Sequence, residues 1–378
     1  MNYKDIKYIG FYDVSNSEEN RNSNLSATNK MDYIISKLNR LGYDVDLISP
    51  SWTNNNKYYK GKRIEINKKN TLFLPPTLPW KGFLKVLSVF LSQLWLFFHL
   101  LFYAKKDEEI VVYHSLLLMH PLYYAKKIKG FTLILEVEEV YQDVRKTSKG
   151  LSIMEYKLIK LADKYIFPTE MLNEKLNTKN KPYTIIYGTY QVEWDRKFRF
   201  NDDKIHVVYA GTFDPRKGGT AAVSAAAHLP KNYHVHIIGF GNEEQKRNII
   251  EQISESRKIS ESTISYDGLL KGEEYIRFIQ SCDIGLSTQK LDASFNNTSF
   301  PSKILSYMAN GLRVVSVRIK AIELSAIGNA IYYYDEQTPE AIAKAIMSID
   351  TKEPNESKRL IKNLDKEFGY NIKDLLEN

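Results

Sequence analysis

The chain has 378 residues, of which 43% are hydrophobic, and a formal net charge of +8. A globular chain of this length is too long for one ordinary core, so we expect two domains. The basic excess predicts an anionic partner, such as nucleic acid, anionic lipid or a nucleotide. The sequence has no block of lysines and arginines with interleaved aromatics, so nucleic acid is not favoured. The single cysteine, Cys282, excludes a disulfide framework and a cysteine-based zinc site. Together with a start that does not resemble a signal peptide, it predicts a cytoplasmic protein.

The first half of the chain alternates predicted strands and helices. A strand is expected at 6–12, a helix with apolar residues at helical spacing at 25–41, and a second strand at 43–48. This βαβ unit predicts a parallel sheet of the α/β class. Residues 51–70 are polar and basic. Further strands are predicted at 71–74, 109–113, 131–135, 164–167 and 183–186, and further helices at 123–129 and 151–162.

Residues 82–104 form the most apolar segment of the chain. The segment is long enough to span a bilayer, but polar side chains including Lys85, Gln93 and His99 interrupt it without forming a clean stripe. Three interpretations remain: a transmembrane helix, a buried helix of the first domain, and a helix at the membrane surface. The flanking Trp80 and Lys105 favour the last two, because such residues anchor helices at interfaces.

Several polar side chains follow predicted strands of the first half. Asp13 follows the first strand, His114 follows the strand at 109–113, and Glu136, Glu138 and Glu139 end the strand at 131–135. Open α/β sheets bind ligands at the carboxyl ends of their strands. His114 is predicted to be either structural or an active-site residue, and the carboxylates to be either a solvated turn or an acid–base site.

Residues 187–203 have no clear period and are predicted to be a linker. The strand–helix rhythm then restarts at Lys204 and continues to a last charged helix at 356–376. Strands are expected at 205–210, 235–238, 264–266, 284–287, 313–317 and 332–334, and helices at 220–228, 243–254, 272–280, 302–309 and 339–349.

Two motifs in this half suit an anionic ligand. The loop GTFDPRKGG at 211–219 follows a strand and opens a helix, and its glycines permit backbone N–H groups to approach a phosphate. The stretch FPSKILSYMANGLRVVS at 300–316 predicts a short helix, a glycine turn and a buried strand. The amino end of such a helix attracts anions. The same spacing also fits an ordinary strand-connecting unit.

The second motif resembles the donor-site signature of GT-B glycosyltransferases, closest to the group-1/family-4 type that builds bacterial surface polysaccharides. The resemblance implies two Rossmann-like domains facing each other across a cleft. Residues 1–187 would form the acceptor-side domain and 188–357 the nucleotide-sugar domain, with a helix at about 358–378 returning to the first domain.

The resemblance also implies a donor site. Lys217 and Gly218 match the family's diphosphate loop, whereas Thr212 stands where the family has arginine. Where the family often carries two glutamates, this chain has Thr298 and Ser306. The implied donor-binding residues are Gly211, Thr212, Arg216, Lys217, Gly218, Tyr266, Gly268, Asn297, Thr298, Ser302, Lys303 and Ser306. The implied candidates for acceptor-side catalysis are Asp13, His114, Glu138 and Glu139.

The expected function is transfer of a sugar from a nucleotide-sugar, with UDP-sugar as the default donor, to a glycan or lipid-linked glycan of an O-antigen or capsule. No cofactor is expected. Nor is a metal, since no DxD motif occurs in a glycosyltransferase context. We expect a cytoplasmic enzyme, peripheral at the membrane. Retention and inversion both remain open, as do a nucleotide-sugar epimerase and a non-catalytic nucleotide-sugar-binding relative.

Overall fold

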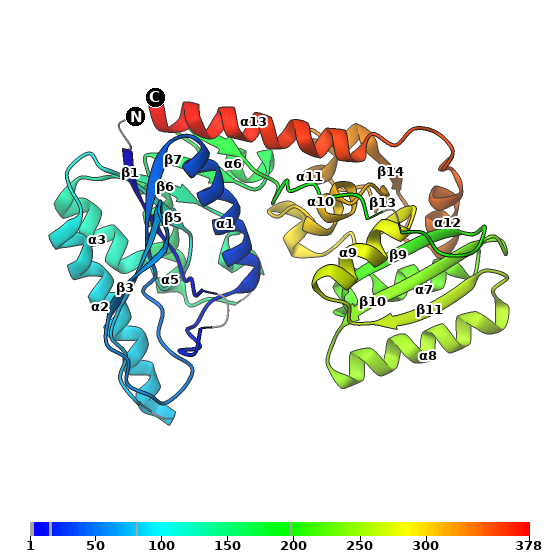
Figure 1. The fold of residues 1–378 in the computed structure, drawn as a ribbon, viewed down its shortest axis with the longest axis horizontal. Coiled ribbons are helices and arrows are strands. Elements are labelled where there is room, and N and C mark those ends of the chain that lie inside the picture. Colours follow the sequence, from blue (N-terminus) through cyan, green and yellow to red (C-terminus); the bar gives the residue numbers. More distant parts are fainter. Residues whose placement is uncertain (1–3, 15–16, 81, 145, 197) are drawn as a thin grey trace. The chain divides into compact units, whose positions relative to one another are not determined.

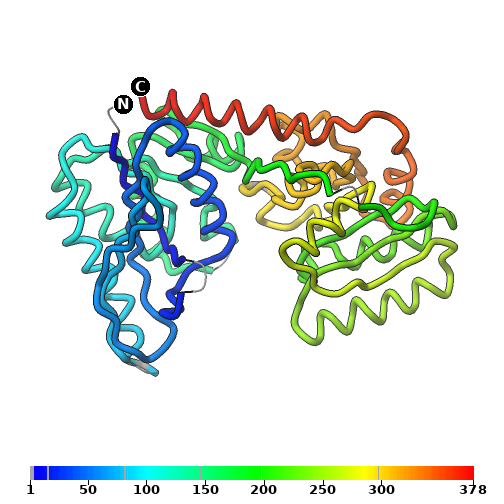
Figure 2. The backbone as a smooth tube through the Cα atoms, viewed as in Figure 1, coloured from blue at the N-terminus to red at the C-terminus, as the bar shows by residue number. Residues whose placement is uncertain are grey.

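The structure is a computed structural model that describes residues 4–14, 17–80, 82–144, 146–196 and 198–378, without the side chains of Phe83 and Asn297. The chain divides into two compact units. The first contains Met1–Thr189 and Phe368–Asn378, and the second contains Tyr190–Glu367. Figures 1 and 2 trace the chain through both.

The first unit is built on an eight-stranded sheet with the order β3-β4-β2-β1-β5-β6-β7-β8. Every paired neighbour is parallel except β3 and β4. The order reverses between β1 and β5, which makes the carboxyl ends of these two strands a topological switch point. The strands are β1 (Lys4–Ile9), β2 (Tyr43–Ile48), β3 (Lys62–Asn67), β4 (Asn70–Leu74), β5 (Glu109–Tyr113), β6 (Thr132–Glu136), β7 (Lys164–Phe167) and β8 (Tyr183–Ile185).

Helices cover both faces of this sheet, with α1 on one side and α2 and α3 on the other (Figure 1). Helix α1 begins at the cap Asn24, whose side chain accepts hydrogen bonds from Ser26 and Ala27. Buried Met31, Ile34 and Leu38 form its core-facing stripe. The helices of this unit are α1 (Leu25–Arg40), α2 (Lys85–Tyr103), α3 (Met119–Lys129), α4 (Tyr141–Val144), α5 (Lys149–Leu161) and α6 (Glu170–Leu176), and a 3₁₀ turn η1 spans Gly82–Leu84.

Helix α2 is the one helix in the described part of the chain whose length and hydropathy would allow it to cross a membrane. Only Ser92, Leu96 and Leu100 are buried, at i, i+4 and i+8. This narrow line joins the core of the first unit, and α2 packs beside α3. Only 17% of its apolar stretch is buried, so α2 is not the ordinary buried helix of the first domain that was one of the three interpretations.

The second unit is a six-stranded, all-parallel sheet with the order β11-β10-β9-β12-β13-β14. Its switch point lies between β9 and β12. The strands are β9 (Ile205–Thr212), β10 (Tyr233–Phe240), β11 (Thr263–Gly268), β12 (Ile284–Ser287), β13 (Arg313–Val317) and β14 (Ile331–Tyr334). The helices are α7 (Gly219–Ala226), α8 (Glu243–Ile259), α9 (Gly272–Ser281), α10 (Ser302–Ala309), α11 (Lys320–Glu323) and α12 (Pro339–Met347), with 3₁₀ turns η2 (Pro215–Lys217), η3 (Ser294–Asn297) and η4 (Gly328–Ala330).

The last helix, α13 (Ser357–Glu377), is shared between the units. Its part from Phe368 onward belongs to the first unit, where the Phe368 ring stacks on Tyr33 with the centroids 5.9 Å apart. Near its end, the Leu375 carbonyl accepts a hydrogen bond of 2.6 Å from Lys164 Nζ. The helix expected to return to the first domain therefore does so only from Phe368 onward.

Candidate active site

The loop after β9 carries the first donor motif. Residues 215–217 form the 3₁₀ turn η2, capped by the Asp214 carboxylate, and Gly218 then opens α7. Gly218 has φ +83°, and a Cβ there would lie 1.8 Å from the Thr288 carbonyl oxygen. Only glycine combines this conformation with so close an approach. The loop after β9 is thereby pressed against the segment that follows β12, across the switch point.

Lys303, on the first turn of α10, is the most distinctive cation of this site. Its Nζ is buried and has no hydrogen-bond partner among the described residues. It lies 3.9 Å from the centroid of the Tyr209 ring, and a Cβ on Gly211 would be 3.1 Å from it. Burial, reinforced by the nearby charge of Lys217, lowers the pKa of Lys303 to about 7.

A cavity of about 210 Å³ opens beside Gly211, at the carboxyl ends of β9 and β10. Leu269 and Leu270, which follow β11, and Tyr275 on α9 complete its apolar side. The Tyr275 hydroxyl lies 3.3 Å from the hydroxyl of Ser306 on α10. Gly211 thus lines the cavity and also lies next to the Lys303 ammonium. The apolar cavity and the buried positive charge are therefore neighbours.

The other predicted donor residues are more scattered. Arg216 forms an exposed ion pair with Asp214 in its own turn, with 2.6 Å between Nη2 and Oδ2. Lys217 Nζ lies 3.8 Å from the centroid of the Phe295 ring. Thr298 is buried, and its hydroxyl has no hydrogen-bond partner among the described residues. Of the rest, Thr212 ends β9, Tyr266 and Gly268 lie on β11, Ser302 is exposed at the start of α10, and the Asn297 side chain lies outside the described residues.

The first unit holds a buried polar cluster at the carboxyl end of β6. The Tyr8 hydroxyl donates a hydrogen bond to the Glu136 carboxylate. Lys30 on α1 lies 3.9 Å from Glu136 and forms a hydrogen-bonded ion pair with Glu138. Glu136 and Glu138 therefore share one side, as strand alternation predicts. Burial raises the pKa of Glu136 to about 8, against the opposing charge of Lys30, so near neutral pH Lys30 compensates Glu138 while Glu136 is protonated.

This raised pKa predicts a pH-dependent effect of Glu136→Gln. In wild type the folded state binds more protons than the unfolded state between pH 4.5 and about 8, so stability falls as pH rises through this window. Glu136→Gln has no titrating carboxyl at this position, so its stability does not fall with pH for this reason. We expect urea unfolding to show Glu136→Gln gaining, relative to wild type, on the order of 2 kcal/mol between pH 6 and pH 9. A difference that stays constant with pH, as expected for the exposed control Glu174→Gln, would contradict the raised pKa.

His114 lies deeper than a substrate-contacting base would. Its side chain is 1% exposed, and its Nε2 lies 3.6 Å from the Glu155 carboxylate on α5. Burial lowers the pKa of His114 to about 4, although a hydrogen bond with the Glu139 backbone works in the opposite direction. The imidazole is therefore neutral near pH 7. The buried position of His114 favours a structural role for this residue over a catalytic one.

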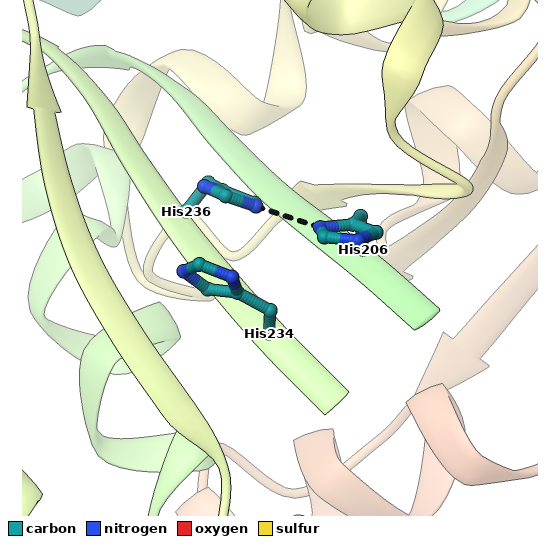
Figure 3. A group of neighbouring side chains, drawn as sticks. All are labelled: His206, His234 and His236. Atoms are coloured by element: carbon teal, nitrogen blue, oxygen red, sulfur yellow. Dashed lines mark hydrogen bonds between the residues drawn. The ribbon is translucent and has the colours of Figure 1, made fainter. Parts of the chain in front are cut away.

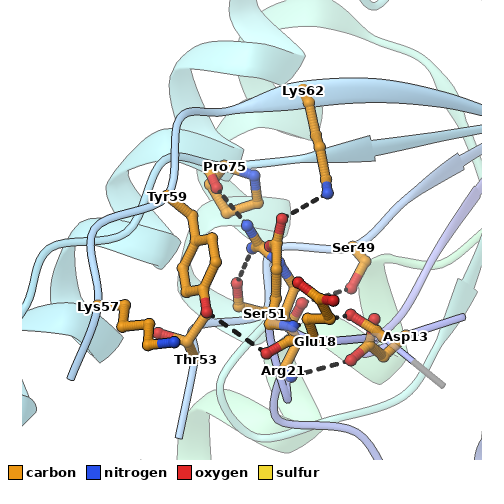
Figure 4. A network of polar contacts seen from close by, with 12 residues as sticks. Asp13, Glu18, Arg21, Ser49, Ser51, Thr53, Lys57, Tyr59, Lys62 and Pro75 are labelled. Carbon is orange, nitrogen blue, oxygen red and sulfur yellow. Dashed lines mark hydrogen bonds and ion pairs between the residues drawn. The ribbon is translucent and has the colours of Figure 1, made fainter. Parts of the chain in front are cut away.

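Asp13 belongs to the loop that follows β1. One of its carboxylate oxygens accepts a 2.9 Å hydrogen bond from the Arg21 backbone N–H. The buried Arg21 guanidinium holds the loop in place, donating to Glu19, to the Ser51 carbonyl and to the Pro75 carbonyl (Figure 4). Burial alone would raise the pKa of Glu19, but hydrogen bonds from Lys62 and Arg21 outweigh it and lower that pKa. The network fixes Asp13 beside the switch point of the first sheet.

Comparison with known proteins places this geometry in a class. Residues 191–367 match the family model described as glycosyl transferases group 1. Solved structures match over nearly the whole chain. One is a trehalose-6-phosphate structure from E. coli bound with UDP-2-fluoro glucose, with TM-score 0.66, 10% identity, and 98% of this chain and 99% of that chain covered.

Two further matches have the same extent. The catalytic domain of starch synthase IV from Arabidopsis thaliana, bound to ADP and acarbose, has TM-score 0.64 and 11% identity over 100% of both chains. Sucrose-phosphate synthase from Thermosynechococcus elongatus has TM-score 0.63 and 15% identity, covering 98% of this chain and 94% of that one. No curated protein sequence matches the chain significantly.

These findings confirm the predicted GT-B fold and the predicted enzyme class. The chain has the GT-B fold, and its residues 191–367 form a group 1 glycosyltransferase domain. The sequence motifs identified the Gly211 loop and the 300–316 unit. They did not reveal Lys30, Tyr8, Glu155 or Tyr275, because these side chains reach the clusters from separate elements and belong to no local motif.

Proposed function

We propose that the protein transfers a sugar from a nucleotide-sugar, most simply a UDP-sugar, to a glycan or lipid-linked glycan acceptor in the synthesis of a bacterial surface polysaccharide. The observation that carries this proposal is the Lys303 ammonium, which is buried and has no hydrogen-bond partner among the described residues, on the first turn of α10 beside Gly211. A buried cation without an anion is costly, so the site is built to receive one.

A diphosphate fits that requirement best. The amino end of α10 adds the positive end of the helix dipole, and Lys217 adds a second ammonium nearby. When the bond from the sugar to the diphosphate breaks, negative charge grows on the departing phosphate oxygen. Charges already in place at Lys303 and Lys217 stabilise that group without reorganising, so the proposed mechanism needs no metal ion.

The neighbouring cavity suits the nucleoside. Its lining by Leu269, Leu270 and Tyr275 offers an apolar surface for a flat base. Ser306 replaces the glutamate of the family pattern and lies within hydrogen-bond distance of the Tyr275 hydroxyl. We assign Ser306 to the ribose hydroxyls and the buried Thr298 hydroxyl to the donor sugar. UDP is the default nucleotide. Because similar solved structures bind UDP-2-fluoro glucose and ADP, the proposed binding experiment compares uracil with adenine.

We assign acceptor activation to the first domain, to the carboxylates that follow β1 and β6, namely Asp13, Glu138 and Glu139. Glu138 is part-exposed and paired with Lys30, which keeps a carboxylate near the surface at the carboxyl end of the sheet. His114 and Glu136 are both buried, so we assign them a structural role beneath these surface carboxylates and no contact with the acceptor. If the reaction inverts the anomeric centre, one of the three carboxylates is the general base. If it retains, the departing phosphate can accept the acceptor's proton.

The apolar surface of α2 supports a membrane-associated acceptor. Leu87, Leu91, Leu94, Phe98 and Phe102 are exposed and follow one another at spacings of four, three, four and four residues. Both ends of α2 connect to strands of the same sheet, β4 and β5, and its line of buried residues packs in the first unit. We therefore propose a cytoplasmic protein that rests on the inner face of the membrane through α2.

Nucleotide binding tests the donor site directly. Isothermal titration of the protein with UDP, ADP and GDP, each with and without its sugar, should show 1:1 binding that prefers one base. Binding of none of them would overturn the proposed donor site. Binding of every nucleotide with equal affinity would retain the diphosphate site but contradict the assignment of the cavity to the base.

A further inference from the structure

Three histidines gather on the second sheet, away from the donor site. His206 lies near the start of β9, and His234 and His236 lie near the start of β10. The register pairs His206 with His234, and residues two apart on a strand point to the same face. All three rings thus lie together at the opposite end of these strands from Gly211 and Gly239 (Figure 3).

Each ring has an outer hydrogen-bond partner on one nitrogen. His206 Nε2 lies 2.7 Å from Asp202 Oδ1, and His236 Nδ1 lies 3.1 Å from Asp267 Oδ2. His234 Nε2 lies 2.9 Å from the Ser265 hydroxyl. A carboxylate can only accept, so the two aspartates fix an N–H on the outer nitrogen of His206 and of His236. The Ser265 hydroxyl donates to Asp267 at 2.7 Å, so His234 Nε2 has to donate to the Ser265 oxygen. The nitrogens His206 Nδ1, His236 Nε2 and His234 Nδ1 are thereby left as acceptors.

Two of these inner nitrogens face each other. His206 Nδ1 and His236 Nε2 are 2.9 Å apart, and both side chains are almost wholly buried. With their protons held by the aspartates, two lone pairs would meet at this distance. Something positive has to lie between them, either one shared proton or a metal ion. The two carboxylates already supply the negative charge that such a cation needs.

We propose that this cluster is a binding site for a divalent transition-metal ion of the zinc type, ligated by His206, His234 and His236. The ligand atoms lie within 4.8 Å of one another. Ligands of a tetrahedral zinc site, at about 2.0–2.1 Å from the metal, stand about 3.3 Å apart, so the His206 and His236 nitrogens need to separate by only a few tenths of an ångström. The His234 ring stacks on His236, with the centroids 3.8 Å apart and the planes at 26°, so it has to turn out of this stack for its lone pair to reach the same ion. Water would take the fourth position.

The surroundings match those of metal-bound histidines. Such ligands usually donate their second ring N–H to a carboxylate, which fixes the tautomer and the ring orientation, as Asp202 and Asp267 do here. The Phe200 ring stacks on His206 with the centroids 4.0 Å apart and covers the inner pair. His234 is only half-buried, and it gives the ion an approach from the surface.

The site would stabilise the second domain rather than take part in sugar transfer. An ion here joins β9 to β10 and, through Asp267, to β11. Asp267 lies at an irregularity of the β10–β11 register, where Ile237 pairs with Tyr266 but Ile238 pairs with Gly268. The ion would thus hold the strand that carries Tyr266 and Gly268. We expect metal to raise the melting temperature without being required for nucleotide binding.

The test uses the full, tag-free chain after treatment with a chelator. Calorimetric titration with Zn²⁺ should give one site per chain, and Co²⁺ should give the visible absorption bands of a tetrahedral nitrogen-ligated ion. His234→Ala, the least buried change, should weaken Zn²⁺ binding at least tenfold. His228→Ala removes a partly exposed histidine outside the cluster and should leave the affinity unchanged.

A second variant guards against misfolding. Asp267→Asn keeps the size of the side chain but weakens the outer partner of His236, and it should reduce Zn²⁺ affinity by about 10- to 100-fold. Circular dichroism checks that each variant is folded. If the wild type shows no stoichiometric binding of Zn²⁺ or Co²⁺, or if His234→Ala and His228→Ala bind equally, the proposal is wrong and the inner pair shares a proton instead.

Discussion

Lys303→Met is expected to weaken binding of UDP, or of whichever nucleoside diphosphate the protein prefers, by about 10- to 100-fold. A charge-assisted hydrogen bond contributes roughly 1.5–3 kcal/mol, and 1.4 kcal/mol corresponds to a factor of ten. Methionine is similar in length and apolar, so it fills the space without the charge. Isothermal titration calorimetry at pH 6.5, where the Lys303 ammonium is mostly charged, measures the effect.

The matched control is Lys231→Met, which removes an exposed lysine just before β10, at the end of the sheet remote from Gly211. Equal affinity losses in the two variants would mean a general effect of net charge and would contradict the assigned site. The unliganded Lys303→Met variant should also be at least as stable as wild type in urea, because it removes a buried charge without a hydrogen-bond partner. A loss of both affinity and stability would instead indicate a damaged fold.

The same lysine predicts that nucleotide binding takes up protons. In the free protein Lys303 has a pKa of about 7, so at pH 8 it is mostly neutral. A bound diphosphate favours the charged form and raises this pKa, so binding at pH 8 draws a proton from solution. Affinity should therefore fall as pH rises from 7 to 9. Titrations in Tris and in HEPES, whose ionisation enthalpies differ, count the protons, and Lys303→Met should abolish the uptake.

The second large effect is expected at the membrane. The triple variant Phe90→Ser, Phe98→Ser, Phe102→Ser should bind vesicles at least 100-fold more weakly than wild type. All three rings are exposed on α2, and burying a phenylalanine side chain in an apolar phase contributes roughly 1.5–3 kcal/mol. Sedimentation with phosphatidylglycerol-containing vesicles measures this directly. Ile259→Ser, which changes an exposed apolar residue at the end of α8, serves as the control.

Extraction from cell membranes separates the remaining interpretations of α2. A helix lying on the surface is released by high salt or carbonate, whereas retention that only detergent reverses would mean that α2 spans the bilayer. If the triple variant changes the oligomeric state while vesicle binding stays the same, the apolar face meets a second copy of the chain rather than lipid. Either result would contradict the proposed peripheral contact.

The amino-acid pattern predicted the parallel core well, because each buried strand carries its own continuous apolar run. The unit at 300–316 is confirmed closely, as helix Ser302–Ala309 followed by strand Arg313–Val317. Strand β3 was not predicted. Its residues Lys62–Asn67 are mostly exposed and half of them are charged, and they form a strand only because they pair antiparallel with β4 at the sheet edge.

The buried face of helix α2 could not be predicted from the order of polar and apolar residues along it. Ser92 is one of the polar residues that interrupt the apolar sequence, yet it is buried, and its hydroxyl donates to the Val89 carbonyl. Large apolar side chains such as Phe98 are instead exposed. Which face of a uniformly apolar helix is covered depends on its neighbour α3, and no local pattern records that.

The clusters of side chains were the least predictable feature. Glu136 was noted as one of three carboxylates, but its protonation comes from burial, which raises its pKa against the opposing effects of Lys30 on α1 and Tyr8 on β1. The signal that could have found the histidine cluster is the His-x-His pair at 234 and 236, of which only His236 lies within the predicted strand 235–238. Its third member, His206, joins it only because β9 and β10 pair in register.

The central claim is sugar transfer from a nucleotide whose diphosphate lies at Lys303. The most direct test incubates the wild type and Lys303→Met with nucleotide-sugars radiolabelled in the sugar, in the absence of acceptor, and separates the products. We predict slow release of free sugar and nucleoside diphosphate by the wild type and at least tenfold slower release by the variant. Conversion to an altered nucleotide-sugar would identify an epimerase. No turnover of any bound nucleotide-sugar, or equal turnover by both proteins, would contradict the proposed mechanism.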